Sequence, residues 1–115
     1  MKFKKFLGFI ILFVLAAGAA WADDDLFIIN KAKAQNINLI TRDQAVKIAD
    51  KELASRNIKA SLHDADLDNN ADKYYNGSDF RPVYELEYKA INSKLEYDFD
   101  IDAVTGEILK FKADD

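Results

Sequence analysis

The clearest pattern in the chain is a run of helical spacing between residues 42 and 56. Apolar side chains recur there every three or four positions, at Ala45, Ile48, Ala49 and Leu53. Thr41 and Gln44 before the run have the spacing of a capping box, in which each side chain accepts a hydrogen bond from the other residue's backbone N–H. We therefore predict an amphipathic helix over 42–56, whose alanines allow a close approach to a sheet.

After this helix the apolar period changes to two. Ile58, Ala60 and Leu62 alternate with polar residues, and the apolar phase then slips by one position toward Ala65 and Leu67. Such a slip predicts a bulge near His63-Asp64 or the end of a strand there. Residues 68–80 have the composition of a loop.

Three further strands are predicted over 83–91, 94–102 and 108–112. A two-residue turn at Asn92-Ser93 pairs the first two strands so that their apolar faces coincide, with Tyr88 opposite Tyr97 and Leu86 opposite Phe99. The last strand fits if Asp102 faces Ile108 and Gly106 takes a positive φ to absorb one extra residue as a bulge.

The same pairing makes the other face of the sheet charged. Glu87 faces Asp98 and Glu85 faces Asp100, which are unfavourable cross-strand pairs. Lys112 and Lys110 of the last strand lie beside these two aspartates and offset their negative charge. The charges of Glu85 and Glu87 are offset less.

The N-terminal residues predict the destination of the chain. A basic start, an apolar run from Phe6 to Ala20 and the exit Ala20-Trp21-Ala22 are typical of a secretory signal peptide over 1–22. The alternative is an uncleaved anchor, which needs about 20 apolar residues. Residues 23–38 are expected to form an N-terminal extension, as a short helix ending near Asn36.

Composition narrows the possible functions. Without its signal the chain has 13 Lys and Arg against 20 Asp and Glu, so an acidic surface repels nucleic acids and anionic lipids. No cysteine is present, which excludes thiol nucleophiles and cysteine metal sites. We expect a periplasmic or secreted protein without stable membrane insertion after cleavage.

Three segments, in order, resemble the PepSY family. They are the capped helix from Ile40 to Ala49, the strand from Arg81 to Tyr88, and a closing segment with Asp102, Thr105 and Gly106 in the spacing D-x-x-T-G. The resemblance covers residues 39–112. It implies an α+β fold in which a helix packs on an antiparallel three- to four-stranded meander, with an extracytoplasmic setting, no catalytic residues and no cofactor. It also implies a protein partner, such as a peptidase that the domain inhibits or regulates.

Two groups of residues are candidates for binding. Aromatic side chains in the polar stretch, together with two carboxylates of the sheet, are candidate partner contacts, although the aromatics can equally fold back over the sheet: Tyr74, Tyr75, Phe80, Glu85 and Glu87. Asp64, Asp66 and Asp68 begin like a calcium loop, but Asn69 and Tyr75 stand where an EF-hand needs Gly and Glu. A solvated acidic loop is the simpler reading. The alternative function is a cation-binding or small-ligand-binding periplasmic protein that uses the acidic segment 64–72.

Overall fold

The computed structural model describes residues 23–74 and 80–115. The expected signal peptide and Tyr75 lie outside this part of the chain. The described elements are, in order, α1 (Asp23–Ala34), α2 (Arg42–Ser55), β1 (Ala60–Asn69), α3 (Ala71–Tyr74), β2 (Pro82–Ala90), β3 (Glu96–Asp102) and β4 (Ile108–Asp114). None of the described helices is long and apolar enough to cross a membrane.

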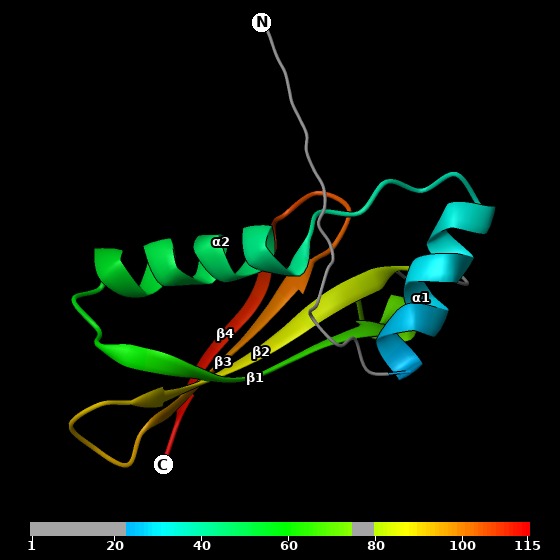
Figure 1. The fold of residues 1–115 in the computed structure, drawn as a ribbon. Coiled ribbons are helices and arrows are strands. Elements are labelled where there is room, and N and C mark those ends of the chain that lie inside the picture. Colours follow the sequence, from blue (N-terminus) through cyan, green and yellow to red (C-terminus); the bar gives the residue numbers. More distant parts are fainter. Residues whose placement is uncertain (1–22, 75–79) are drawn as a thin grey trace, which may run out of the picture.

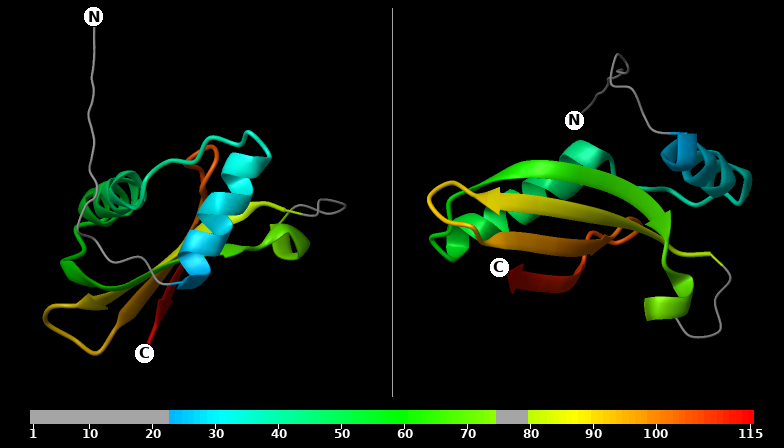
Figure 2. Two further views of the ribbon diagram at one scale, coloured as in Figure 1. Left: turned by 45° about the vertical axis from the view of Figure 1, so that its right-hand side comes forward. Right: turned by 90° about the horizontal axis from the view of Figure 1, so that it is seen from below.

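The strands form one antiparallel sheet in the order β1-β2-β3-β4. Helix α2 lies across one face of this sheet, and α1 lies at one end of it, beside β1 (Figure 1). Seen from the side opposite α2, β1 and β4 are the two edges (Figure 2). The predicted α+β arrangement of a helix on a meander is confirmed.

Helix α2 begins as the sequence predicts. The Gln44 N–H donates to Thr41 Oγ1 at 3.1 Å, and the Thr41 N–H donates to Gln44 Oε1 at 2.8 Å, which completes the capping box. Ala45 and Ala49 are fully buried under the helix. Because their side chains are small, the helix backbone approaches the sheet closely enough for the Tyr88 hydroxyl to donate to Asp50 at 2.8 Å.

Aromatic rings from three strands form the core beneath α2. Phe99 at the centre of the sheet is fully buried, and its ring centroid lies 5.7 Å from Tyr88 and 4.9 Å from Phe111. Tyr84 is also buried and donates its hydroxyl hydrogen to the Ile40 carbonyl at 2.9 Å. Each phenol thus keeps a hydrogen bond inside the apolar layer.

The predicted pairing of β2 with β3 is confirmed, including Tyr88 opposite Tyr97 and Leu86 opposite Phe99. The connection is longer than the predicted two residues. The ladder ends at Lys89 and Glu96, and the Ala90 N–H donates to the Leu95 carbonyl at 2.9 Å, leaving 91–94 as the turn. The bulge predicted at His63 is present, because the register of β1 shifts between Leu62 and Asp64.

The beginning of β4 differs from the prediction. Ile101 faces Ile108 rather than Leu109, because the register shifts between Asp100 and Ile101. The cause is the preceding turn. It is closed by hydrogen bonds of 2.8 Å from the Asp102 N–H to the Glu107 carbonyl and from the Gly106 N–H to the Asp102 carbonyl. Gly106 does take the predicted positive φ, at 82°.

The segment predicted as a loop over 68–80 is partly regular. Asp68 and Asn69 extend β1, and residues 71–74 form the single turn of α3. Asn69 holds this geometry, since its Oδ1 accepts hydrogen bonds from the Ala71 N–H at 3.2 Å and the Arg81 N–H at 2.8 Å. The polar residues of this segment suggested a loop. Instead, the Asn69 side chain forms hydrogen bonds that connect the end of β1 to α3 and to Arg81.

Candidate functional site

The face of the sheet opposite α2 carries two rows of charged side chains that run across the strands. Strand pairing aligns Asp64, Glu87, Asp98 and Lys112 in the first row, which we call the open row. It aligns Asp66, Glu85, Asp100 and Lys110 in the second, which we call the covered row. Each row contains three carboxylates and one ammonium group.

In the covered row, side chains of residues 70–74 donate hydrogen bonds to two of the three carboxylates. Asp100 is only 3% exposed. It accepts hydrogen bonds from the Tyr74 hydroxyl and from Lys73 Nζ at 3.2 Å, and Lys110 Nζ lies 3.8 Å away. Burial and then the hydrogen bond to Asp100 raise the pKa of the Tyr74 phenol, and the same carboxylate raises the pKa of Lys73.

The other members of the covered row are not equivalent. Glu85 accepts a hydrogen bond from Asn70 Nδ2 at 2.9 Å, so it has more compensation than the sequence suggested. Asp66 is exposed, and partial burial followed by the nearby charges of Asp64, Asp25 and Asp68 raises its pKa. The cover therefore reaches β2 and β3 but not the β1 edge.

The open row has no such cover among the described residues. Asp64 and Lys112 are exposed, and Glu87 and Asp98 are half-buried. A hydrogen bond with the Glu96 carboxyl group raises the pKa of Glu87. Asp98 opposite Glu87 raises it further. A carboxylate that holds its proton more tightly shows that negative charge accumulates on this part of the surface.

The predicted aromatic contacts lie in different places. Tyr74 folds back over the charged face and binds Asp100, while Phe80 is 7% exposed with Lys31 Nζ 4.9 Å from its ring centroid. Glu85 and Glu87 fall in different rows. The structure thus places Glu87, but not Tyr74 or Phe80, on an open surface.

The acidic triplet Asp64, Asp66 and Asp68 belongs to a strand and not to a loop. The residues alternate along β1, and two of them already accept backbone hydrogen bonds, Asp64 from Ala65 at 3.0 Å and Asp68 from Asn69 at 2.8 Å. Within 23–74 and 80–115, no group of three or more His, Cys, Asp or Glu side chains is arranged to hold a metal ion. The only histidine, His63, is exposed at the bulge of β1.

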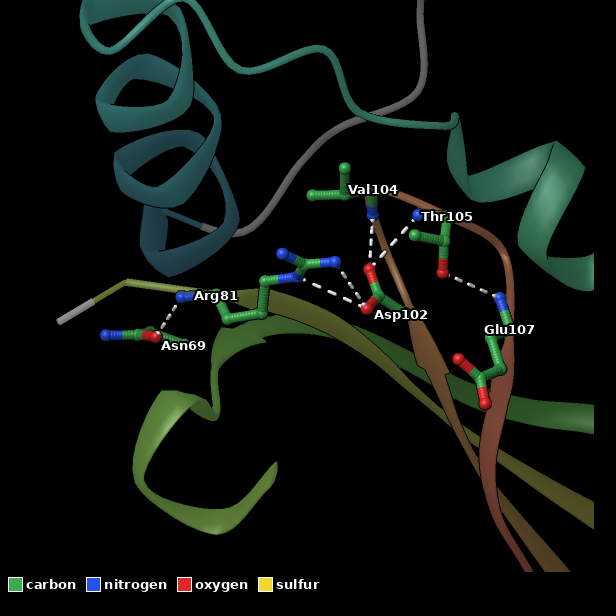
Figure 3. A network of polar contacts seen from close by, with 6 residues as sticks. All are labelled: Asn69, Arg81, Asp102, Val104, Thr105 and Glu107. Atoms are coloured by element: carbon green, nitrogen blue, oxygen red, sulfur yellow. Dashed lines mark hydrogen bonds and ion pairs between the residues drawn. The ribbon is translucent and has the colours of Figure 1, made fainter. Parts of the chain in front are cut away.

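The buried Asp102 of the closing segment is the centre of a polar network that extends to the exposed Thr105 (Figure 3). Asp102 is fully buried, and its Oδ2 receives Arg81 Nε at 3.2 Å and Nη2 at 3.0 Å, while Oδ1 accepts from the Val104 and Thr105 N–H groups at 2.7 and 3.1 Å. The Thr105 hydroxyl then accepts from the Glu107 N–H at 3.2 Å. This network fixes the turn between β3 and β4.

Sequence reasoning identified the turn but missed the role of Arg81. The one available signal was the position of Arg81 directly before the Pro82 strand, across the sheet from the end of β3. A buried carboxylate requires a partner and hydrogen bonds, so Asp102 itself implied a cation elsewhere in the chain. The arrangement is structural, since its polar atoms are directed at one another.

Comparison with known proteins agrees with the motifs. The family model described as "Peptidase propeptide and YPEB domain" matches residues 39–112. No curated protein and no solved structure matches the chain. Helix α1 precedes the matched region, yet Ile28 and Ala32 belong to the same buried core. The capped helix, the four-stranded meander and the D-x-x-T-G turn agree with this match, and the chain belongs to the PepSY family.

Proposed function

We propose that the chain is an exported, non-catalytic module that binds a protein partner through the open row and thereby regulates a peptidase. The observation that carries this proposal is that the described side chains of residues 70–74 form hydrogen bonds with carboxylates of the covered row but not with those of the open row. Three carboxylates of the open row face water beside Glu96, whereas the matching carboxylates of the covered row on β2 and β3 are bonded to residues 70–74.

The open row has an energetic cost in the free protein. Like charges directly opposite one another across two strands are destabilising, and Glu87 and Asp98 are such a pair. A basic surface on a partner would remove this repulsion on binding and would also accelerate encounter at low salt. A cluster of this kind therefore favours recognition of a cationic protein surface.

Family membership supports the choice of a peptidase as the partner class. The family description refers to peptidase propeptides, and a propeptide is made as part of the peptidase that it precedes. The signal peptide expected over 1–22 would bring the chain out of the cytoplasm. Within the described residues no group of three or more His, Cys, Asp or Glu side chains is arranged to hold a metal ion.

The test is an inhibition assay with the protein as the cell exports it. Full-length chain is expressed with its own N-terminus, purified after export and added to envelope extract whose hydrolysis of casein is recorded. We expect hydrolysis to fall in a dose-dependent manner and the effect to weaken as salt is raised. The double variant Glu87→Lys with Asp98→Lys should abolish the effect.

The matched control is Glu107→Lys, which reverses an exposed carboxylate outside both rows. It should inhibit like the unchanged protein. Equal loss in the control and the double variant would reject the open row as the contact, and an unaltered rate of hydrolysis at all concentrations would reject peptidase regulation.

A further inference from the structure

The two edges of the sheet differ in whether their outward backbone groups are occupied. On β1 the N–H groups that point away from β2 belong to Ala65, Leu67 and Asn69. Each donates to a carboxylate: Ala65 to Asp64 at 3.0 Å, Leu67 to Asp25 of α1 at 3.1 Å and Asn69 to Asp68 at 2.8 Å. Together with the bulge at His63, these hydrogen bonds prevent another strand from pairing with the outer edge of β1.

The β4 edge has no comparable device in the described part of the chain. Lys110 faces Asp100 and Lys112 faces Asp98. The Asp102 N–H donates to the Glu107 carbonyl, so the backbone groups of Asp102, and of Asp100 and Asp98 at alternate positions before it, point toward β4. Because directions alternate along a strand, Phe111 and Ala113 point their N–H and C=O groups away from the sheet. Among the described residues, no side chain accepts from these two N–H groups.

We propose that β4 is a docking edge that receives an extended segment of the protein partner as a fifth strand. Backbone groups of Phe111 and Ala113 would continue the ladder, which is the usual way in which an exposed edge binds a peptide. The inference rests on the proposed function for the existence of a partner, but its site is the β4 edge, which shares only Lys112 with the open row.

Side chains beside the edge define the chemistry of the segment. On the charged face, Lys110 and Lys112 are 37% and 58% exposed, so carboxylates opposite them would form favourable cross-strand pairs. On the other face the Phe111 ring is stacked on Tyr97 at 5.9 Å and lies 4.3 Å beneath the Arg56 guanidinium. The preferred segment therefore alternates acidic and apolar residues.

A second copy of this chain fits the same edge less well than an acidic segment does. Antiparallel pairing of two β4 strands centred on Phe111, which overlaps most of the strand, would place Lys110 of each copy opposite Lys112 of the other. Pairing centred on Ala113 would place Lys112 opposite Asp114, but it overlaps only the last residues of the strand. The acidic β1 edge of a second copy would match in charge, but its outward N–H groups are already occupied. The lysines therefore favour an acidic segment over a second copy paired along the whole strand.

The experiment uses two synthetic ten-residue peptides as probes. One alternates Glu and Val, and the other alternates Lys and Val. Isotope-labelled full-length chain, purified after export, is titrated with each peptide while amide resonances and amide hydrogen exchange are recorded. We expect the acidic peptide to bind roughly tenfold more tightly than the basic one, from two cross-strand pairs. Exchange at Phe111 and Ala113 should slow when it binds.

A pair of proline variants locates the binding. Ala113→Pro removes an outward N–H of β4 without removing a bond to β3, and Ala65→Pro makes the same change on the β1 edge. Ala113→Pro should abolish binding of the acidic peptide, whereas Ala65→Pro should leave it unchanged. Thermal unfolding of both variants verifies that each remains folded, and Lys112→Glu, which keeps the backbone donors, should reduce binding of the acidic peptide.

Three results would overturn the inference. They are equal binding of the two peptides, protection at the β1 edge instead of β4, and a dimer of the unchanged chain whose formation Ala113→Pro prevents. If the peptide fails to bind but the open row still governs inhibition of casein hydrolysis, the β4 inference falls and the proposed function stands. If the peptide binds but no peptidase responds, the reverse holds.

Discussion

The open and covered rows have the same charges but opposite surroundings. Each crosses four strands with three carboxylates and one lysine. The covered row receives Lys73, Tyr74 and Asn70 from a segment that folds back over it, and Asp100 becomes buried as a result. The open row receives nothing from the described residues and its glutamate holds its proton more tightly. Charge composition alone therefore does not tell whether a polar sheet face is structural or available for binding.

The largest expected effect comes from exchanging the central aspartate of each row for asparagine. Asp100→Asn should lower the free energy of unfolding by about 1.5–3 kcal/mol, because a buried charged acceptor of several hydrogen bonds is lost. Asp98→Asn, two residues away on the same strand and in the open row, should leave stability unchanged or raise it, since it removes one of two opposed negative charges. Urea denaturation of both variants measures the difference. Equal destabilisation would show that the two rows are not distinct.

A smaller effect is expected when the cover itself is weakened. Tyr74→Phe deletes the hydroxyl that donates to Asp100 but keeps the ring, and should cost about 1 kcal/mol. Lys73 and Lys110 remain near the carboxylate, so the row should stay folded. Thermal unfolding of this variant beside Tyr97→Phe, whose hydroxyl is not part of the cover, separates the lost bond from a general effect of removing a phenol. No difference between the two would mean that residues 70–74 do not stabilise the row.

Much of the two rows could be predicted from alternation. The pairing of β2 with β3 followed from the phase of Leu86 and Tyr88 against Phe99 and Tyr97, and it placed Glu87 opposite Asp98 and Glu85 opposite Asp100. The lysines of β4 also followed, since the register shift of that strand lies beyond Asp100. Strands with one apolar face fix their register strongly, because a slip of one residue would expose the apolar side chains.

The cover could not be predicted, because it depends on contacts between residues far apart in sequence. A helix of one turn has no periodicity to detect, and Tyr74 is 26 positions from Asp100. The pairing of Arg81 with Asp102 was missed for the same reason. The role of Asp64 and Asp68 in β1 was also missed, because no sequence pattern indicates that a side chain accepts a hydrogen bond from an edge N–H group. Local patterns therefore predicted the sheet but not which of its polar side chains are occupied.

The smallest expected effect is a pH dependence that distinguishes the glutamates of the two rows. The hydrogen bond with Glu96 raises the folded-state pKa of Glu87, so the folded protein binds this proton more tightly than the unfolded chain does. Its contribution to stability is therefore fully present below the unfolded pKa of glutamate and is lost as pH rises through the higher folded pKa. Glu87→Gln should thus raise the melting temperature slightly at neutral pH and show no gain at acidic pH. Glu85→Gln, which alters a carboxylate bonded to Asn70, should give no gain at either pH. The measurement is the melting temperature of the two variants from acidic to neutral pH. The same change with pH in both variants would mean that the charge of Glu87 destabilises the fold no more than that of Glu85.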